Sequence, residues 1–170
     1  AAAIAPSFAA EFTDLPNYRY LVGLLRKLGF DKVVEVGFGA DMVSKAYNRI
    51  IQDPDHAGII SSDCPAIVYY IEHYHPELVS SLAPITSPMV ATTRIIREKY
   101  GSDYAVAFIG PCIAKKAESA EVDVVITFAE LRRMLQNITD QLDEVVPSEF
   151  DPPVAGRGAV YPVSRGMLQT

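Results

Sequence analysis

Hydrophobic residues along the chain alternate between short, β-branched runs and longer stretches with helical spacing. The short runs predict strands at residues 1–5, 32–36, 58–60, 104–111 and 122–126. The longer stretches predict helices at residues 18–28, 41–51, 65–74, 89–99 and 129–138. Strands that alternate with helices indicate an α/β fold, with a mostly parallel sheet and helices on both faces.

Capping residues support two of the predicted helices. Pro65 suits the first position of a helix, which places Asp63 or Cys64 near the N-cap. Thr127 and Glu130 have the T-x-x-E spacing of a capping box, in which each side chain accepts a backbone N–H of the other residue. Both helices therefore have defined starting points.

The C-terminal part of the chain has a weaker pattern. From Pro147 onward the sequence is rich in turn residues, and residues 159–163 are at most an edge strand because they contain Pro162. The chain has no internal repeat and no low-complexity tract. We therefore expect residues 1–170 to form a single domain.

Composition and charge exclude several classes of partner. The 170 residues are 49% hydrophobic and 21% charged, which is ordinary for a soluble domain with its own core. The net charge of -6 and the lack of a basic cluster argue against nucleic acid binding. No apolar run is long enough to span a membrane, and the N-terminus lacks the basic region of a signal peptide. We expect a cytoplasmic protein.

The two cysteines, Cys64 and Cys112, are the main candidates for chemistry. They could form one long-range disulfide, remain reduced as buried thiols, or bind a metal. Each follows a predicted strand, and parallel strands present their carboxyl ends, where ligands gather, at one edge of the sheet. Cys64 also precedes a helix N-terminus, which stabilises thiolate. Two thiolates are half of the usual four-cysteine set of an iron–sulfur cluster.

Three other features carry weaker signals. Lys115 follows Cys112 by three residues and could place positive charge beside a thiolate or an anionic ligand, or could be a solvated helix start. His73 and His75 favour surface or helix-end positions over a catalytic pairing with a cysteine. Residues 37–40 resemble a dinucleotide-binding loop only faintly, because the third glycine is missing.

Longer motifs around the cysteines carry a family resemblance. The segments SSDCPAIVYYIEHYHPELVSSLAPITSPM and FIGPCIAKKAES resemble the catalytic domain of iron-only (di-iron) hydrogenases. The resemblance extends over nearly the whole chain, through AIAPSFAAEF, LGFDKVVEVGFGAD, VDVVITFAEL and PVSRGML. It is strongest to the hydrogenase-like domains of hydrogen-sensing or signalling proteins.

The resemblance implies a role for each motif residue. Cys64 and Cys112 would ligate the 4Fe-4S cubane of the hydrogen-activating cluster, and Lys115 would hydrogen-bond a cyanide ligand of the di-iron subsite. Asp63, Ser87, Lys115 and Glu118 would be the catalytic residues, with Ser87 and Glu118 in the proton path. The residues expected to bind the cofactor are Ala5, Pro6, Pro88, Met89, Pro111 and Lys115.

Three departures from the family pattern qualify these expectations. The third motif, which brings two further cysteines, is absent, so we expect a fragment of a larger protein that binds no cofactor by itself and is inactive alone. Asp63 stands where many active enzymes have a cysteine, and Met89 stands where they often have glutamine. The last two departures put efficient hydrogen turnover in doubt.

The leading hypothesis is a cluster-binding domain whose parent reacts with or senses H2 through proton and electron transfer. The resemblance implies an anaerobe, with a ferredoxin-type electron donor or an attached iron–sulfur domain as partner. An alternative is a non-catalytic iron–sulfur module related to cytosolic cluster-assembly proteins. A third hypothesis, independent of the resemblance, is a thiol enzyme that pairs Cys64 with a histidine. Whether the parent is a hydrogenase-like oxidoreductase stays open at this point.

Overall fold

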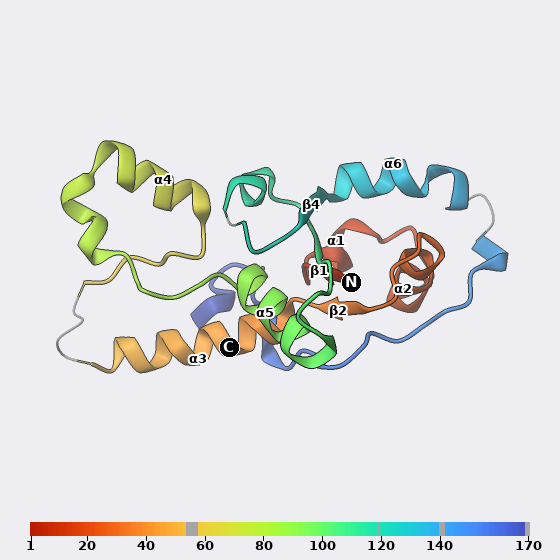
Figure 1. Cartoon of the computed structure of the whole chain (residues 1–170), viewed down its shortest axis with the longest axis horizontal. Coiled ribbons are helices and arrows are strands. Elements are labelled where there is room, and N and C mark those ends of the chain that lie inside the picture. Colours follow the sequence, from red (N-terminus) through yellow and green to blue (C-terminus); the bar gives the residue numbers. More distant parts are fainter. Residues whose placement is uncertain (54–57, 119, 140–141, 169–170) are drawn as a thin grey trace.

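A four-stranded parallel sheet forms the centre of the molecule (Figure 1). The computed structural model describes residues 1–53, 58–118, 120–139 and 142–168. Its sheet contains β1 (Ala2–Ile4), β2 (Val33–Glu35), β3 (Ala107–Gly110) and β4 (Val124–Thr127). The strand order is β2-β1-β3-β4, and every neighbouring pair is parallel. The predicted parallel sheet is therefore confirmed.

Helices cover both faces of this sheet. The helices α2 (Tyr18–Lys27) and α6 (Phe128–Thr139) contact each other, as do α3 (Gly37–Ile51) and α5 (Pro88–Tyr100). The chain leaves β1 through α2 to reach β2 on one side, then returns through α3 and α5 to β3 on the other side. Because both crossovers are expected to be right-handed, the two helix pairs lie on opposite faces.

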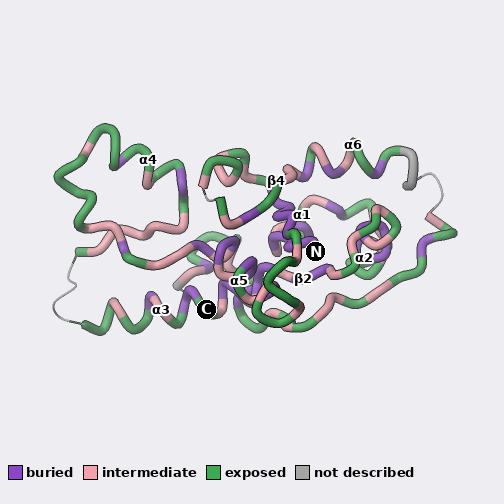
Figure 2. Tube along the Cα trace, viewed as in Figure 1, coloured by how far each residue is buried: buried purple, intermediate pink, exposed green. Residues whose placement is uncertain are grey.

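The core lies between the sheet and these helices. Figure 2 shows the buried residues gathered around the strands, with exposed residues on the outer helices. Hydrophobic side chains on α2 and α6 and at the strand positions fill this core, among them Ile4, Leu21, Leu24, Leu25, Val33, Val34, Ile109 and Leu131. A smaller cluster of Val43, Tyr47 and Ala83 lies apart from it.

Shorter elements connect the layers. The helix α1 (Phe8–Glu11) follows β1, and α4 (Pro65–Tyr74) continues into the 3-10 helix η2 (Pro76–Ser81). The remaining 3-10 segments are η3 (Ile113–Ala117), η4 (Leu142–Glu144), η5 (Arg157–Val160) and η6 (Gly166–Leu168). In Figure 1, α4 lies at one end of the molecule, away from the sheet. None of the helices in the described ranges is long and apolar enough to cross a membrane.

The helix α3 begins one turn earlier than the sequence predicts. The prediction started it at Asp41, because glycine disfavours helix interiors. The structure includes Gly37 and Gly39 in the first turn. A Cβ on Gly39 would lie 2.2 Å from the Thr92 Oγ1 atom of α5, so glycine is required here by close helix packing. This close packing accounts for the glycine, so the faint resemblance to a dinucleotide-binding loop needs no separate explanation.

Two predicted strands are wrong. Residues 58–60 contribute only an isolated bridge between Ile60 and Leu82, outside the sheet. Residues 159–163 lie in and after the 3-10 helix η5 rather than in an edge strand. Both segments are apolar enough to suggest strands, but the four strands of the parallel sheet come from other parts of the chain. The short helix α1 was not predicted, and β3 and β4 differ from their predicted bounds by one to three residues.

Candidate functional site

A pocket lies at the carboxyl edge of the sheet, between the loops that follow β1 and β3. The adjacent strands β1 and β3 lead to crossovers on opposite sides, so the loops after them diverge at their carboxyl ends. Such switch points are where parallel α/β sheets bind ligands. The pocket has a volume of about 190 Å³ and its lining is mostly apolar. It is lined by Ala5, Pro6, Ser7, Val36, Ala40, Asp63, Pro88, Met89, Phe108, Pro111, Cys112, Lys115, Tyr161 and Pro162.

The two cysteines occupy equivalent positions in different elements. Cys112 follows β3, is the N-cap of η3 and lines the pocket. Cys64 is the N-cap of α4 and is exposed. The prediction that Cys64 follows a sheet strand is wrong, because residues 58–60 are not part of the sheet. Both thiols are free, which excludes the disulfide interpretation in this structure.

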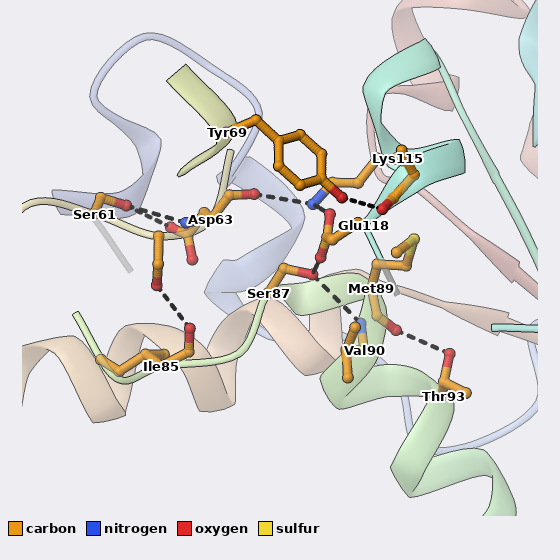
Figure 3. A network of polar contacts seen from close by, with 12 residues as sticks. Ser61, Asp63, Tyr69, Ile85, Ser87, Met89, Val90, Thr93, Lys115 and Glu118 are labelled. Atoms are coloured by element: carbon orange, nitrogen blue, oxygen red, sulfur yellow. Dashed lines mark hydrogen bonds and ion pairs between the residues drawn. The ribbon is translucent and has the colours of Figure 1, made fainter. Parts of the chain in front are cut away.

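Lys115 connects the two cysteine turns (Figure 3). Its Nζ atom donates a hydrogen bond to the carbonyl oxygen of Asp63, at 2.9 Å, directly before Cys64. The same ammonium forms an ion pair with Glu118. The Lys115 and Glu118 side chains are only 13% and 14% exposed. The lysine therefore lies inside the molecule, between the turn that carries Cys112 and the turn that carries Cys64.

The polar chain continues from Glu118 to α5. The hydroxyl of Ser87 donates to the Glu118 carboxylate, and its Oγ atom also accepts from the Val90 backbone N–H at 3.5 Å. Ser87 is thus the N-cap of α5, and Pro88 occupies the first helical position. Met89 follows with 1% of its surface exposed and lines the pocket. Figure 3 shows Ser87 and Glu118 between Lys115 and α5.

Asp63 has an unusual environment. Its Oδ2 atom accepts hydrogen bonds from the Ser61 hydroxyl, at 3.1 Å, and from the Tyr161 phenol. Its Oδ1 atom is buried and has no hydrogen-bond partner among the described residues. Burial raises the pKa of Asp63, although the bonds from Tyr161 and Ser61 and the charge of Lys115 oppose the shift. Burial and the contact with Asp63 raise the pKa of Tyr161 as well.

Most of the sequence-predicted site residues meet at this pocket. Ala5 and Pro6 follow β1, Pro111 follows β3, and all three line it together with Asp63, Pro88, Met89, Cys112 and Lys115. Ser87 and Glu118 lie behind Lys115 and line a second pocket, of about 310 Å³, with Glu72 and Glu121. Cys64 lines neither pocket.

Sequence reasoning missed the C-terminal wall of the pocket. Tyr161 and Pro162 belong to a turn-rich segment, and the hydrogen bond from Tyr161 to Asp63 spans 98 positions in sequence. No local pattern signals such a contact. Of the histidines that the structure describes, the His73 Nδ1 atom is 2.8 Å from the Tyr69 carbonyl oxygen, and His75 contacts Glu77 and Tyr70. None of these contacts is with Cys64 or Cys112, so the described histidines give the thiol-enzyme hypothesis no support.

The donor set fits part of an iron–sulfur cluster. The chain offers two thiol sulfurs as soft ligands, a lysine for an anionic group, and the buried Asp63 Oδ1 atom, which has no hydrogen-bond partner among the described residues. Among the described residues, however, no group of three or more Cys, His, Asp and Glu side chains could hold a metal ion. Two cysteines would be half of the usual four-cysteine set of a 4Fe-4S cluster, so a complete set would need two further ligands.

A parallel α/β sheet with a pocket at its switch point is a common ligand-binding architecture. Residues 1–170 match the family described as "Iron only hydrogenase large subunit, C-terminal domain". The chain belongs to this family. The family resemblance in the cysteine motifs is thereby confirmed.

Individual relatives fall into two groups. Iron hydrogenase 1 of Clostridium pasteurianum is 29% identical, over 98% of this chain and 34% of that protein. A protein named as a cytosolic Fe-S cluster assembly factor, from Drosophila virilis, is 30% identical, over 85% of this chain and 36% of that protein. The chain thus spans about a third of the length of these curated relatives.

Solved structures confirm the fold. A FeFe-hydrogenase captured during stepwise H-cluster assembly matches with a TM-score of 0.75 and 22% identity, over 94% of this chain and 52% of that one. A FeFe-hydrogenase variant from Chlamydomonas reinhardtii matches with a TM-score of 0.73 and 23% identity, over the same shares. At this identity the likeness establishes the fold alone.

Proposed function

We propose that residues 1–170 are the part of a larger hydrogenase-like protein that supplies Cys64 and Cys112 to a 4Fe-4S cluster and holds a di-iron subsite in the pocket. The single observation that carries the proposal is the position of Lys115. Its ammonium bonds the backbone beside Cys64, while its own turn begins at Cys112. One largely buried cation therefore connects two turns whose cysteines are 48 positions apart in sequence.

The chemistry of the thiols supports this proposal. Cys64 and Cys112 are the N-caps of α4 and η3. Thiolate is the form of cysteine that binds iron. A 4Fe-4S cluster takes four such ligands, so two more cysteines must come from the rest of the parent protein. Without them, we expect the isolated domain to hold no intact cluster and to be inactive.

The other pocket residues have complementary roles. Lys115 places positive charge where an anionic group would bind, and Ala5, Pro6, Pro88, Met89 and Pro111 provide an apolar wall that limits water. When bound, a di-iron subsite would supply the interconversion of H2 with protons and electrons. Glu118 and Ser87 form a hydrogen-bonded chain from Lys115 to the second pocket. This chain would hold protons on their way between the subsite and solvent.

The sensing form of the proposal rests on two side chains. Asp63 and Met89 line the pocket, where we expect fast enzymes of the family to have cysteine and glutamine. A protein that binds H2 but turns it over slowly suits a signalling role. We further propose a cytoplasmic parent in an anaerobe, with a ferredoxin-type donor or an attached iron–sulfur domain as electron partner.

The alternative is a non-catalytic iron–sulfur module. The 30% identical relative from Drosophila virilis, named as a cytosolic Fe-S cluster assembly factor, favours this second candidate. A relative with that name from Meyerozyma guilliermondii, 29% identical over 82% of this chain, adds to it. Both candidates use Cys64 and Cys112 as iron ligands, and they differ in whether a di-iron subsite reacts with H2.

Isotope exchange separates the two candidates. The full-length protein, matured anaerobically, would be incubated with D2 in ordinary water, and HD release would be followed by mass spectrometry. The hydrogenase-like proposal predicts HD release that depends on the protein, and a marked loss in Lys115→Ala. Iron and sulfide in the protein without any HD release would support the assembly-related module instead.

A further inference from the structure

A strap of residues 155–163 covers one side of the pocket. Of its members, Tyr161 and Pro162 line the pocket, while Gly156, Arg157, Ala159, Val160 and Val163 are exposed. The strap contains only one short 3-10 helix, η5, and forms no sheet ladder. Its position therefore depends on its packing against α3 and η6 and on the contacts described next.

The first contact anchors the strap to α3. The Asp41 carboxylate accepts the backbone N–H groups of Gly156 and Gly158, each at 2.7 Å, with one oxygen for each bond. Gly158 lies so close to α3 that an added Cβ would be 1.9 Å from the Gly37 carbonyl oxygen. This end of the strap is held by two charge-assisted hydrogen bonds and by direct backbone packing.

The second contact lies at the pocket itself. The Tyr161 phenol donates to the Oδ2 atom of Asp63, in the turn directly before Cys64. The Tyr161 ring also packs against the small apolar cluster of Val43, Tyr47 and Ala83. Beyond Tyr161 the strap residues Pro162 and Val163 are exposed. At this end the described hydrogen bonds connect the strap to the pocket only through Tyr161.

We propose that the Tyr161–Asp63 hydrogen bond is a clasp that keeps the strap closed over the pocket and shields Cys112. Release of the clasp would let Tyr161 and Pro162 swing away while Asp41 still holds the other end. Because the strap contributes nothing to the sheet, this opening leaves the central core intact, as expected for local unfolding. The inference concerns this chain alone and holds with or without a bound cluster.

The labelling rates of the two thiols can report opening of the strap. Cys112 lines the pocket, whereas Cys64 is exposed and lies outside it. In the metal-free chain, N-ethylmaleimide labelling followed by peptide mass spectrometry gives a separate rate for each thiol. We expect Cys112 to react more slowly than Cys64 in the wild type.

The clasp is tested by Tyr161→Phe, which keeps the ring and removes the hydroxyl. Loss of one hydrogen bond to a carboxylate should raise the Cys112 rate by about tenfold or more and leave the Cys64 rate unchanged. Tyr104→Phe is the matched control, because the Tyr104 phenol also donates to a carboxylate, that of Asp31, on an exposed surface. It should change neither rate.

Hydrogen exchange distinguishes a local opening from general destabilisation. In Tyr161→Phe, amides of the strap should exchange faster, whereas amides of β3 should keep their protection. If β3 also loses protection, a second variant, Asp41→Asn, tests whether the strap opens locally. The amide of asparagine keeps only one of the two acceptor oxygens that hold the strap. That variant should raise the Cys112 rate with β3 unchanged. The proposal is overturned if Cys112 labels as fast as Cys64 in the wild type, or if no strap variant changes the ratio of the two rates.

Discussion

The buried ion pair between Lys115 and Glu118 yields a quantitative prediction. Lys115→Met keeps most of the side-chain volume but removes the charge, which leaves Glu118 with the Ser87 hydroxyl as its remaining partner. Removal of one partner from a buried pair typically costs 3–5 kcal/mol. Because both side chains keep slight exposure and Ser87 still donates, we expect a loss of about 3 kcal/mol in the free energy of unfolding.

Urea denaturation of the chain at neutral pH, followed by circular dichroism, measures this loss. Lys116→Met is the matched control, since Lys116 pairs with Glu130 at the surface, where the two side chains are 38% and 41% exposed. Surface pairs contribute little, so this variant should be nearly as stable as the wild type. The double variant with Glu118→Gln should cost less than the sum of its single changes, because the two residues act on one interaction. A loss below about 0.5 kcal/mol in Lys115→Met would refute the buried-pair reasoning.

Three further outcomes follow from other parts of the structure. Gly39→Ala should lower the free energy of unfolding by about 2 kcal/mol in the same urea assay, because its Cβ would collide with Thr92 and with the Pro88 carbonyl. An unchanged urea midpoint would contradict the close packing of α3 on α5. The bonds from Lys116 and Thr127 lower the pKa of Glu130 from 4.5 to about 2. The contribution of this exposed carboxylate to stability is small because solvent screens it; it is complete above pH 4.5 and is lost as the pH falls towards 2. Acid titration of Glu130→Gln, followed by circular dichroism, should show less loss of stability over that range, and an identical acid limb would count against the capping box. Cys112→Ser should abolish labelling in the pocket without changing the Cys64 rate, and altered Cys64 labelling would show that the two thiols are not independent reporters.

Much of the fold could be predicted from hydrophobic periodicity and caps. The predicted helices at 18–28, 65–74 and 89–99 agree with α2, α4 and α5 to within one residue at each end. The capping box is confirmed by two bonds: the Thr127 backbone N–H donates to Glu130 at 2.7 Å, and the Glu130 N–H donates to the Thr127 hydroxyl at 3.2 Å. These features are local, so the sequence carries them directly.

The errors arise where tertiary contacts override local preference. Glycines 37 and 39 disfavour a helix, yet α5 and the strap approach α3 so closely that only glycine fits. Residues 58–60 have the composition of a strand but pair only with the segment after η2. The sequence contains no signal for either contact, because each depends on a partner more than 20 positions away.

The candidate site shows the same division. The motif residues Asp63, Met89, Cys112 and Lys115 were predicted from the resemblance, and the structure gathers them at one pocket. Tyr161 was not predicted, because its role depends on a clasp between distant segments. The roles of these residues in catalysis and in cluster binding stay predictions.

The central claim, that Cys64 and Cys112 are iron ligands of one shared site, has a direct test. Iron and acid-labile sulfide would be quantified in the full-length protein matured anaerobically, as wild type and as Cys64→Ala and Cys112→Ala. We expect bound iron and sulfide in the wild type, with a large loss of both in each variant. Wild-type levels of iron and sulfide in the two variants would contradict it.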